Sequence, residues 1–144
     1  MNVESILKVK GDAVITIPPT ATLAEAVDLL ARRRIGALVV SADGAVPQGI
    51  LSERDIVRGL GAEGASLLDR QVETAMTRTV VTCSPGDQIA DLMALMTERR
   101  IRHVPVLRNG RLAGLVSIGD VVKSRVDEIE YEASSLKTYI AGVP

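Results

Sequence analysis

The chain has 144 residues, of which 47% are hydrophobic and 24% charged, and its formal net charge is −1. This composition is typical of a folded globular protein, and a chain of this length buries about 70% of the surface it exposes when unfolded. The balanced charge excludes the strongly basic surface of a nucleic-acid-binding protein. The aromatic content of 1% excludes base stacking on aromatic platforms.

Cysteine, histidine and membrane signals are scarce. The single Cys83 cannot form an internal disulfide, and no signal-peptide pattern opens the chain. No apolar run approaches the ~20 residues that span a bilayer. We therefore expect a protein of the reducing cytoplasm that does not associate with membranes. The only histidine, His103, cannot form a multi-histidine metal site, so neither a metal nor a required cofactor is expected.

An internal repeat organises the chain. The two copies align at an offset of 66 residues over the first strand, helix and second strand, and at 65 after the following turn. Upstream, residues 3–7 echo residues 72–76 at an offset of 69. The pattern predicts four regions, which are a first repeat at 3–60, a linker at 61–71, a second repeat at 72–124 and a C-terminal helical tail at 125–144.

Each copy predicts the element order β-α-β-β-α and therefore an α/β protein. Short β-branched runs at 14–17 and 79–82 predict the first strands. Thr22 and Glu25 form a capping-box pattern before the amphipathic helix of the first copy, and Asp87 is expected to cap the equivalent helix.

The hairpins follow these helices. Strands are predicted at 37–40 and 48–51 in the first copy and at 103–107 and 111–116 in the second. Asn109-Gly110 predicts a type I′ turn. In the tail, apolar residues recur at helical spacing and form a stripe that needs a partner surface.

One motif occurs twice in equivalent places. Glycine, two hydrophobic residues, serine, two further residues and aspartate occupy positions 49–55 and again 114–120. A strand that runs directly into a helix leaves unpaired N–H groups that can bind an anion. An aspartate in the first turn can hold the cis diol of a ribose. The same residues also make an ordinary helix N-cap, and both interpretations stay open for each copy, although the recurrence favours binding.

With these motifs the sequence resembles a tandem pair of cystathionine β-synthase (CBS) domains, the Bateman module, in a stand-alone bacterial form. The resemblance covers about residues 3–123 and rests on the second-strand segments 35–40 and 101–106 and the helix starts 52–57 and 117–122. It implies two repeats packed through their sheets about a pseudo-twofold axis. It also implies two clefts that bind AMP, ATP, NAD or a related ligand.

The resemblance implies roles for particular residues. Asp55 and Asp120 would hold ribose hydroxyls, and Ser52 and Ser117 would contact ribose or phosphate. Arg102 occupies the second-strand position where some family members place a phosphate-binding arginine. Further contacts are expected from the first strands, which would face adenine, from the second strands and from the helix start: Thr16, Ile17, Ala37, Arg54, Thr82, Cys83 and His103.

The two sites are not expected to be equivalent. The first copy has Gly36 where the second has Arg102, so we expect the second copy, with Ser117 and Asp120, to favour phosphate more. Ordinary alternatives remain for the other cations. Arg54 would be a solvated surface residue, and the arginines at 32–34 and 99–100 would complement the negative ends of their helices. Lys8 and Lys10 either approach a phosphate or lie in a solvated loop.

The sequence therefore predicts an adenine-nucleotide-binding regulatory module that acts on an unidentified partner protein and forms a homodimer. We do not expect an enzyme, because the chain has one histidine, one cysteine and no phosphate-cradling Gly-x-x-x-x-Gly-Lys loop. The alternative is an interaction scaffold whose clefts are empty or vestigial.

Overall fold

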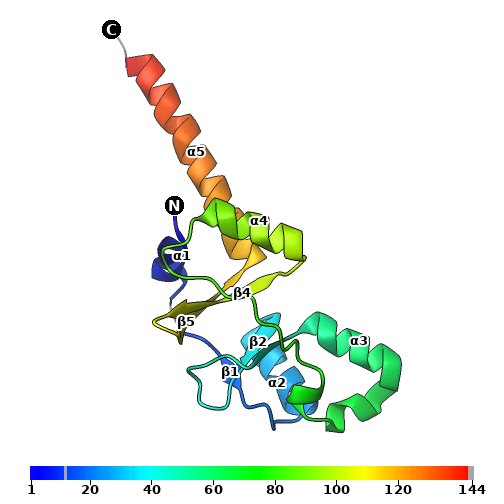
Figure 1. The fold of residues 1–144 in the computed structure, drawn as a ribbon. Coiled ribbons are helices and arrows are strands. Elements are labelled where there is room, and N and C mark those ends of the chain that lie inside the picture. The colour runs from blue at the N-terminus through cyan, green and yellow to red at the C-terminus, as the bar shows by residue number, and fades with distance from the viewer. Residues whose placement is uncertain (12, 143–144) are drawn as a thin grey trace.

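The computed structural model describes residues 1–11 and 13–142 as an α/β protein (Figure 1). Two short 3₁₀ helices, η1 (Gly64–Asp69) and η2 (Val72–Thr74), join its two halves. The longer elements follow one another as α1 (Val3–Lys10), β1 (Thr16–Ile17), α2 (Leu23–Arg33), β2 (Ala37–Val40), β3 (Gly49–Ser52), α3 (Glu53–Glu63), α4 (Ile89–Arg99), β4 (His103–Arg108), β5 (Arg111–Ser117) and α5 (Ile118–Gly142).

The two halves contain different sheets. In the first, β1 runs parallel to β2, and β2 pairs antiparallel with β3. In the second, β4 pairs antiparallel with β5. The prediction of a strand at 79–82 is wrong, because only Cys83 bridges to β4, at Val106. Pro105 stands where the first half has Val39, and it has no N–H to donate to a neighbouring strand.

The turns and caps agree in part with the sequence prediction. Asn109 and Gly110 have φ values of 54° and 79°, the positive values that a type I′ turn requires. The capping box of Thr22 and Glu25 is present. The prediction that Asp87 caps α4 is wrong: Gln88 is the N-cap, and the Asp87 carboxylate instead accepts the backbone N–H of Ser84 in the preceding turn.

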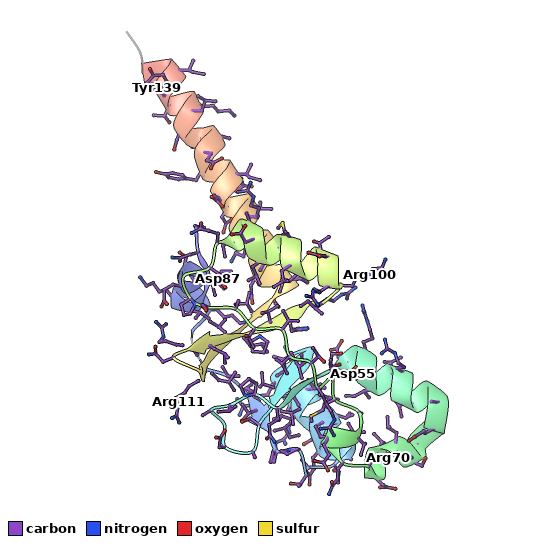
Figure 2. The ribbon with its side chains drawn as sticks, in the orientation of Figure 1. Asp55, Arg70, Asp87, Arg100, Arg111 and Tyr139 are labelled. Atoms are coloured by element: carbon purple, nitrogen blue, oxygen red, sulfur yellow. The ribbon has the colours of Figure 1, made fainter. Side chains whose placement is uncertain are left out.

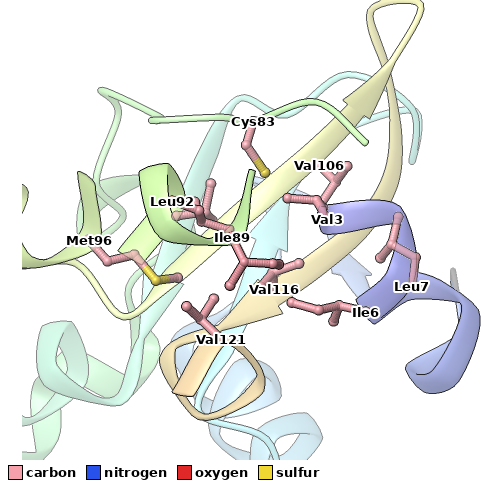
Figure 3. Close-up of a cluster of buried hydrophobic side chains, with 11 residues drawn as sticks. Val3, Ile6, Leu7, Cys83, Ile89, Leu92, Met96, Val106, Val116 and Val121 are labelled. Carbon is pink, nitrogen blue, oxygen red and sulfur yellow. The ribbon is translucent and has the colours of Figure 1, made fainter. Parts of the chain in front are cut away.

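Each repeat contributes side chains to the hydrophobic core of the other. Val3, Ile6 and Leu7 of α1 pack into the core of the second repeat, beside Val116 and Val121 (Figure 3). Conversely, Val72 is buried in the core of the first repeat, and Ala75 and Met76 pack against it. The first residues of each repeat therefore complete the core of the other repeat, and the packing units of the structure do not coincide with the repeats of the sequence.

The glycine of the repeated motif makes this exchange of side chains possible. A Cβ at Gly49 would lie 2.5 Å from the sulfur of Met76 and 3.0 Å from the carbonyl oxygen of Thr77. A Cβ at the equivalent Gly114 would overlap the side chain of Leu7. Because Leu7 and Met76 are themselves equivalent in the repeat, the two contacts are related by the pseudo-twofold symmetry of the fold.

The linker and the tail are both helical in part. The predicted linker contains the end of α3 and the helix η1, whose Leu67 is buried in the first core. The tail is not a separate element, because α5 continues without a break from Ile118 to Gly142 and extends away from the remainder of the molecule (Figure 1). The last two residues of the predicted tail, 143–144, lie outside the described residues.

Candidate functional site

Two clefts lie where the repeats meet. The first cleft has a volume of about 550 Å³ and the second about 320 Å³. Both volumes fall within the range of about 300–1,000 Å³ that is typical of small-molecule sites. The two clefts are therefore large enough for ligands, and the second is the smaller.

Each cleft combines parts of both repeats. One repeat supplies the residues shortly before Ile17 or Cys83 and the start of β2 or β4. The other repeat supplies the start of its last helix. In the first cleft these parts are Thr79, Val80 and Val81, then Arg100, Ile101, Arg102 and His103, then Ile50, Ser52 and Asp55. In the second cleft the equivalent parts are Ala13, Val14 and Ile15, then Arg34, Ile35, Gly36 and Ala37, then Leu115 and Ser117.

This arrangement corrects one expectation from the sequence. Arg102 shares the first cleft with Ser52 and Asp55, which belong to the other repeat. It does not lie with Ser117 and Asp120, as the grouping by repeat predicted. The sequence of one repeat could not predict that Arg102 meets Ser52 and Asp55, because the helix start that faces each strand depends on how the two repeats pack.

The helix start in the first cleft is a complete capping box. The backbone N–H of Ser52 donates to Asp55 Oδ2 over 2.9 Å, and the backbone N–H of Asp55 donates to Ser52 Oγ over 3.4 Å. The Ser52 hydroxyl also donates to Asp55 Oδ2, over 3.1 Å. No described residue donates a hydrogen bond to Asp55 Oδ1 in this arrangement. Capping and ligand binding are therefore compatible, because Oδ2 caps the helix and Oδ1 is available to a ligand.

The first cleft is rich in arginine. Four arginines line it: Arg54, Arg58, Arg100 and Arg102. The carboxylates of Glu53 and Asp55 line the same cleft. Within the described residues none of the four forms an ion pair. Figure 2 shows Arg100, at the end of α4, on the same side of the molecule as Asp55, at the start of α3. This positive charge suits a ligand with phosphate groups.

Two of the cleft arginines have unusual backbone conformations. Arg34 and Arg100, at equivalent places in the repeat, end α2 and α4 in the left-handed region, with φ of 54° and 55°. This conformation costs an ordinary residue about 1 kcal/mol relative to glycine, which usually ends helices in this way. From the sequence, both arginines were expected only to complement the negative ends of their helices. Their identical place in the two copies was the signal that could have indicated the clefts.

An internal ion pair occupies the rim of the second cleft. Lys10 Nζ donates to Asp120 Oδ2 over 2.6 Å and to the carbonyl oxygen of Leu115 over 2.8 Å. Because Lys10 is the last residue of α1, the expectation that it lies in a solvated loop is wrong. Lys8 is in the same helix and is exposed.

Asp120 is engaged more fully than Asp55. Its Oδ2 also accepts the backbone N–H of Ser117 over 2.9 Å, so the capping interaction and Lys10 share one oxygen. Burial by itself would raise the pKa of Asp120, but the hydrogen bonds and charge of Lys10 and the bonds of Ser117 outweigh it and lower the pKa. Asp120 does not line the second cleft, whereas Lys10 does.

His103 borders both clefts. Burial lowers the pKa of its imidazole, and the positive charge of Lys10 lowers it further. Both effects favour the neutral form of the ring. It lies close to Gly36, where a Cβ would be 3.5 Å from His103 Cε1. The glycine at this position leaves room for the histidine between the two clefts.

Besides Asp120, four of the expected contact residues line neither cleft: Thr16, Ile17, Thr82 and Cys83. Ile17 and Cys83 belong to the two hydrophobic cores, and burial, followed by the charge of Asp87, raises the pKa of the Cys83 thiol to about 12. The residues just before them, at 13–15 and 79–81, lie in the clefts instead. The other expected residues Arg54, Ala37 and His103 do line a cleft.

Neither a metal-binding cluster nor a membrane-spanning helix is present in the described residues. Residues 1–11 and 13–142 contain no cluster of histidine, cysteine and acidic side chains that could hold a metal ion. In the same part of the chain, no helix is both long and apolar enough to cross a membrane.

A family model for the CBS domain matches the chain twice, at residues 8–62 and 70–127. The chain belongs to the CBS-domain family. The two matches confirm the tandem pair of repeats, and CBS-domain proteins of known structure confirm the fold. The CBS-domain containing protein ATU1752 from Agrobacterium tumefaciens is 47% identical, with a TM-score of 0.83 over 87% of this chain and 99% of that one.

Curated relatives carry the same CBS pair. The mitochondrial CBS domain-containing protein CBSX3 of Arabidopsis thaliana is 38% identical over 125 residues, which make up 84% of this chain and 61% of the plant protein. The CBS domain-containing protein YhcV of Bacillus subtilis is 31% identical over 78% of this chain and 79% of its own length. The chain thus spans about three-fifths of the plant relative and most of the bacterial one.

A more distant CBS pair has been crystallised with ligands. That pair, from protein MJ0100, is in complex with 5′-methylthioadenosine and S-adenosyl-L-methionine. It is 24% identical to this chain, with a TM-score of 0.76 over 85% of it, a similarity that concerns the fold alone.

Proposed function

We propose that this CBS pair binds an adenine nucleotide of the AMP, ATP or NAD class and thereby regulates a partner protein. One observation carries the proposal: the first cleft brings four arginines from both repeats to a helix start whose Asp55 has a carboxylate oxygen without a partner among the described residues. Arginines and the unpaired N–H groups of a helix start bind phosphate, and a carboxylate binds the hydroxyls of a ribose.

The remainder of the first cleft supports an adenine ring. Ile50, Val80, Val81 and Ile101 provide aliphatic surface beside the charged residues. The chain has no Phe or Trp, so the ring would lie between aliphatic side chains and receive its hydrogen bonds from the backbone. The adenosine ligands of the MJ0100 pair are compatible with this chemistry.

The two clefts would differ in affinity. A nucleotide in the second cleft has to displace Lys10 from Asp120, or bind beside it and use its ammonium group as a phosphate ligand. The first cleft needs no such displacement and has more arginines. We therefore propose the first cleft, which contains Arg102, as the stronger phosphate site. The sequence also led us to expect that the site of Arg102 favours phosphate, but it grouped Arg102 with Ser117 and Asp120.

Regulation follows from the composition of the clefts. A ligand that contacts residues of both repeats favours the arrangement of the repeats that it fits best, and it shifts the population toward that arrangement. The proposal includes self-association and an action on a further protein, because a binding module transmits its state through contacts. The cytoplasmic location remains a prediction, with which the buried free thiol of Cys83 is compatible.

Catalysis is not part of this proposal. His103, the only histidine, has a lowered pKa and lies between the clefts, and no cysteine or hydroxyl group donates a hydrogen bond to it in the described part of the chain. A general base needs a group to deprotonate within hydrogen-bonding distance.

The alternative function, an interaction scaffold with vestigial clefts, is favoured by one observation. In the second cleft, Lys10 already forms an ion pair with Asp120, although Asp120 Oδ1 accepts no hydrogen bond from a described residue. If Lys10 holds Asp120 permanently, a ligand in the second cleft loses that carboxylate, and only the first cleft can bind a nucleotide through its aspartate.

Isothermal titration calorimetry of the full chain with AMP, ATP, NAD and S-adenosylmethionine tests the proposal. We expect binding of at least one of them, and Asp55→Ala to weaken the tighter site about tenfold to a hundredfold, because a charge-assisted hydrogen bond is lost. Asp120→Ala should affect only the weaker site.

The matched control is Asp91→Ala, which removes an exposed first-turn carboxylate of α4 away from both clefts. It should bind as the wild type does. The absence of binding heat and of a thermal shift with all four ligands would exclude nucleotide sensing and favour the scaffold. An unchanged affinity in Asp55→Ala would reject the assignment of the ribose contact.

A further inference from the structure

One face of α5 carries an apolar side chain at alternating intervals of four and three residues. The six residues, here called the α5 seam, are Val122, Val126, Ile129, Ala133, Leu136 and Ile140. Its side chains are exposed, from 45% at Val122 to 66% at Ile140. Six consecutive positions of this kind make nearly three heptads, over a length of about 27 Å. This is the pattern of a coiled-coil surface rather than of a helix that covers a globular core.

The seam is not the face by which α5 packs within the chain. The helix contacts α4, α1 and β5, and its buried residue is Val121, which precedes the first seam residue. Consecutive helical residues are about 100° apart around the axis, so the seam lies to the side of the packed face. A second helix placed on the seam would therefore leave the two globular parts on opposite sides of the pair.

The charges beside the seam indicate which helix fits. In heptad notation, Val126, Ala133 and Ile140 occupy the a positions, and Val122, Ile129 and Leu136 the d positions. The flanking charged residues are Lys123, Glu130 and Lys137 at e and Arg125 and Glu132 at g.

Two identical parallel helices in register bring each g residue beside the e residue five positions later on the other helix. Arg125 then faces Glu130, and Glu132 faces Lys137, so that every such pair is attractive. Arg125 is 39% exposed and has one ion pair, with Glu128 on its own helix, which is a weak surface contact.

An antiparallel pair with the same overlap has the opposite result. It would place Val122 beside Ile140, and it would pair e with e and g with g. Lys123 would then face Lys137, and Glu130 and Glu132 would each face their own copies. The charges therefore favour the parallel arrangement and disfavour the antiparallel one.

We propose that α5 binds α5 of a second copy of this chain as a parallel, in-register, two-stranded coiled coil through the α5 seam. β-Branched residues at a with leucine at d favour two strands. Val126, Ile140 and Leu136 match this preference, whereas Val122 and Ile129, at d, do not, so the argument for the pairing rests on the flanking charges. The family match ends at residue 127, so most of the seam lies outside the CBS repeats. The inference rests on the self-association in the proposed function and is independent of nucleotide binding in the clefts.

Sedimentation equilibrium of the full chain tests the surface. We expect a dimer, and Leu136→Glu should weaken its dissociation constant by at least a hundredfold, because a charge at a d position is buried in the interface. The matched control is Tyr131→Glu, which places the same charge on the outer face at a residue 74% exposed. It should leave the dimer unchanged. Leu136 is 59% exposed, so neither substitution disturbs the fold of one chain.

Charge reversal tests the orientation. Lys137→Glu should weaken a parallel dimer about tenfold, because it faces Glu132 of the other copy, and addition of Glu132→Lys should restore it. In the antiparallel arrangement Lys137→Glu would instead face Lys123 and strengthen the dimer. Leu136→Cys should give a disulfide-linked dimer with oxidised glutathione, since equivalent d positions adjoin only in the parallel form, whereas Tyr131→Cys should not.

A monomeric wild type, or a dimer that Leu136→Glu leaves intact, would overturn the proposal. A dimer strengthened by Lys137→Glu would overturn the parallel orientation. Calorimetry with nucleotides is a separate measurement, so failure of ligand binding and failure of the coiled coil are distinguishable.

Discussion

The two clefts are built from equivalent positions, yet they differ in what the chain itself places in them. In the first, Asp55 forms no ion pair with a described residue, and the cations that line the cleft are arginines. In the second, Asp120 is bonded to Lys10, which comes from a helix that has no full counterpart in the other repeat. A duplicated fold thus repeats the backbone framework of a site, whereas residues outside the framework determine its chemistry.

The largest effect on stability is expected at the two glycines where the repeats contact each other. A methyl group at Gly49 would meet both Met76 and the carbonyl oxygen of Thr77, whereas one at Gly114 would meet only the end of the flexible Leu7 side chain. We expect Gly49→Ala to lower the free energy of unfolding by about 2 kcal/mol, and Gly114→Ala by less than about 1 kcal/mol. Urea unfolding of both variants measures the difference, and equal losses would contradict it.

A smaller effect is expected from Lys10. Lys10→Met keeps the aliphatic length of the side chain but frees Asp120, so adenosine, which has no phosphate, should bind the second cleft up to about tenfold more tightly. ATP should gain less, because the ammonium group is lost as a phosphate ligand. Lys8→Met, two residues earlier on the exposed side of α1, is the control. Calorimetry that shows no gain for adenosine would mean that Lys10 does not limit the second cleft.

The smallest effect concerns pH. Burial lowers the pKa of His103, so the unfolded chain binds a proton more readily than the folded one. The stability due to the neutral imidazole is therefore complete above the ordinary histidine pKa of about 6.5 and is lost as the pH falls below it. Between pH 7 and 5.5 the wild type should lose more of its free energy of unfolding than His103→Gln does. Equal pH dependence in chemical denaturation would show that the ring is not protected.

The sequence predicted the parts of this fold that depend on neighbouring residues. The β2–β3 hairpin, the type I′ turn at Asn109 and the capping box at Thr22 all depend on side chains within a few positions, and all are present. The predicted strand at 79–82 failed because Pro105, more than twenty residues later, cannot donate the required hydrogen bond. A local sequence pattern does not show whether the neighbouring strand can supply the hydrogen bonds that a new strand needs.

The candidate site shows the same limit. The helix starts at Ser52 and Ser117 could be recognised from the repeated motif, and both are capped as the sequence suggested. The assignment of Arg102 to the cleft of its own repeat was wrong, because strand and helix start meet across the repeat boundary. The contact of Lys10 with Asp120 joins residues 110 positions apart, a distance over which no sequence periodicity operates.

The position of α1 also affects how the chain reaches this structure during synthesis. During synthesis α1 precedes the segments that it packs against: Glu4 bonds to Pro85, about eighty residues later, and Leu7 packs against Gly114. Such a contact of long sequence separation forms slowly and leaves Val3, Ile6 and Leu7 exposed in the meantime. The residues of α1 thus leave the ribosome well before their partners and are among the last to reach their native place.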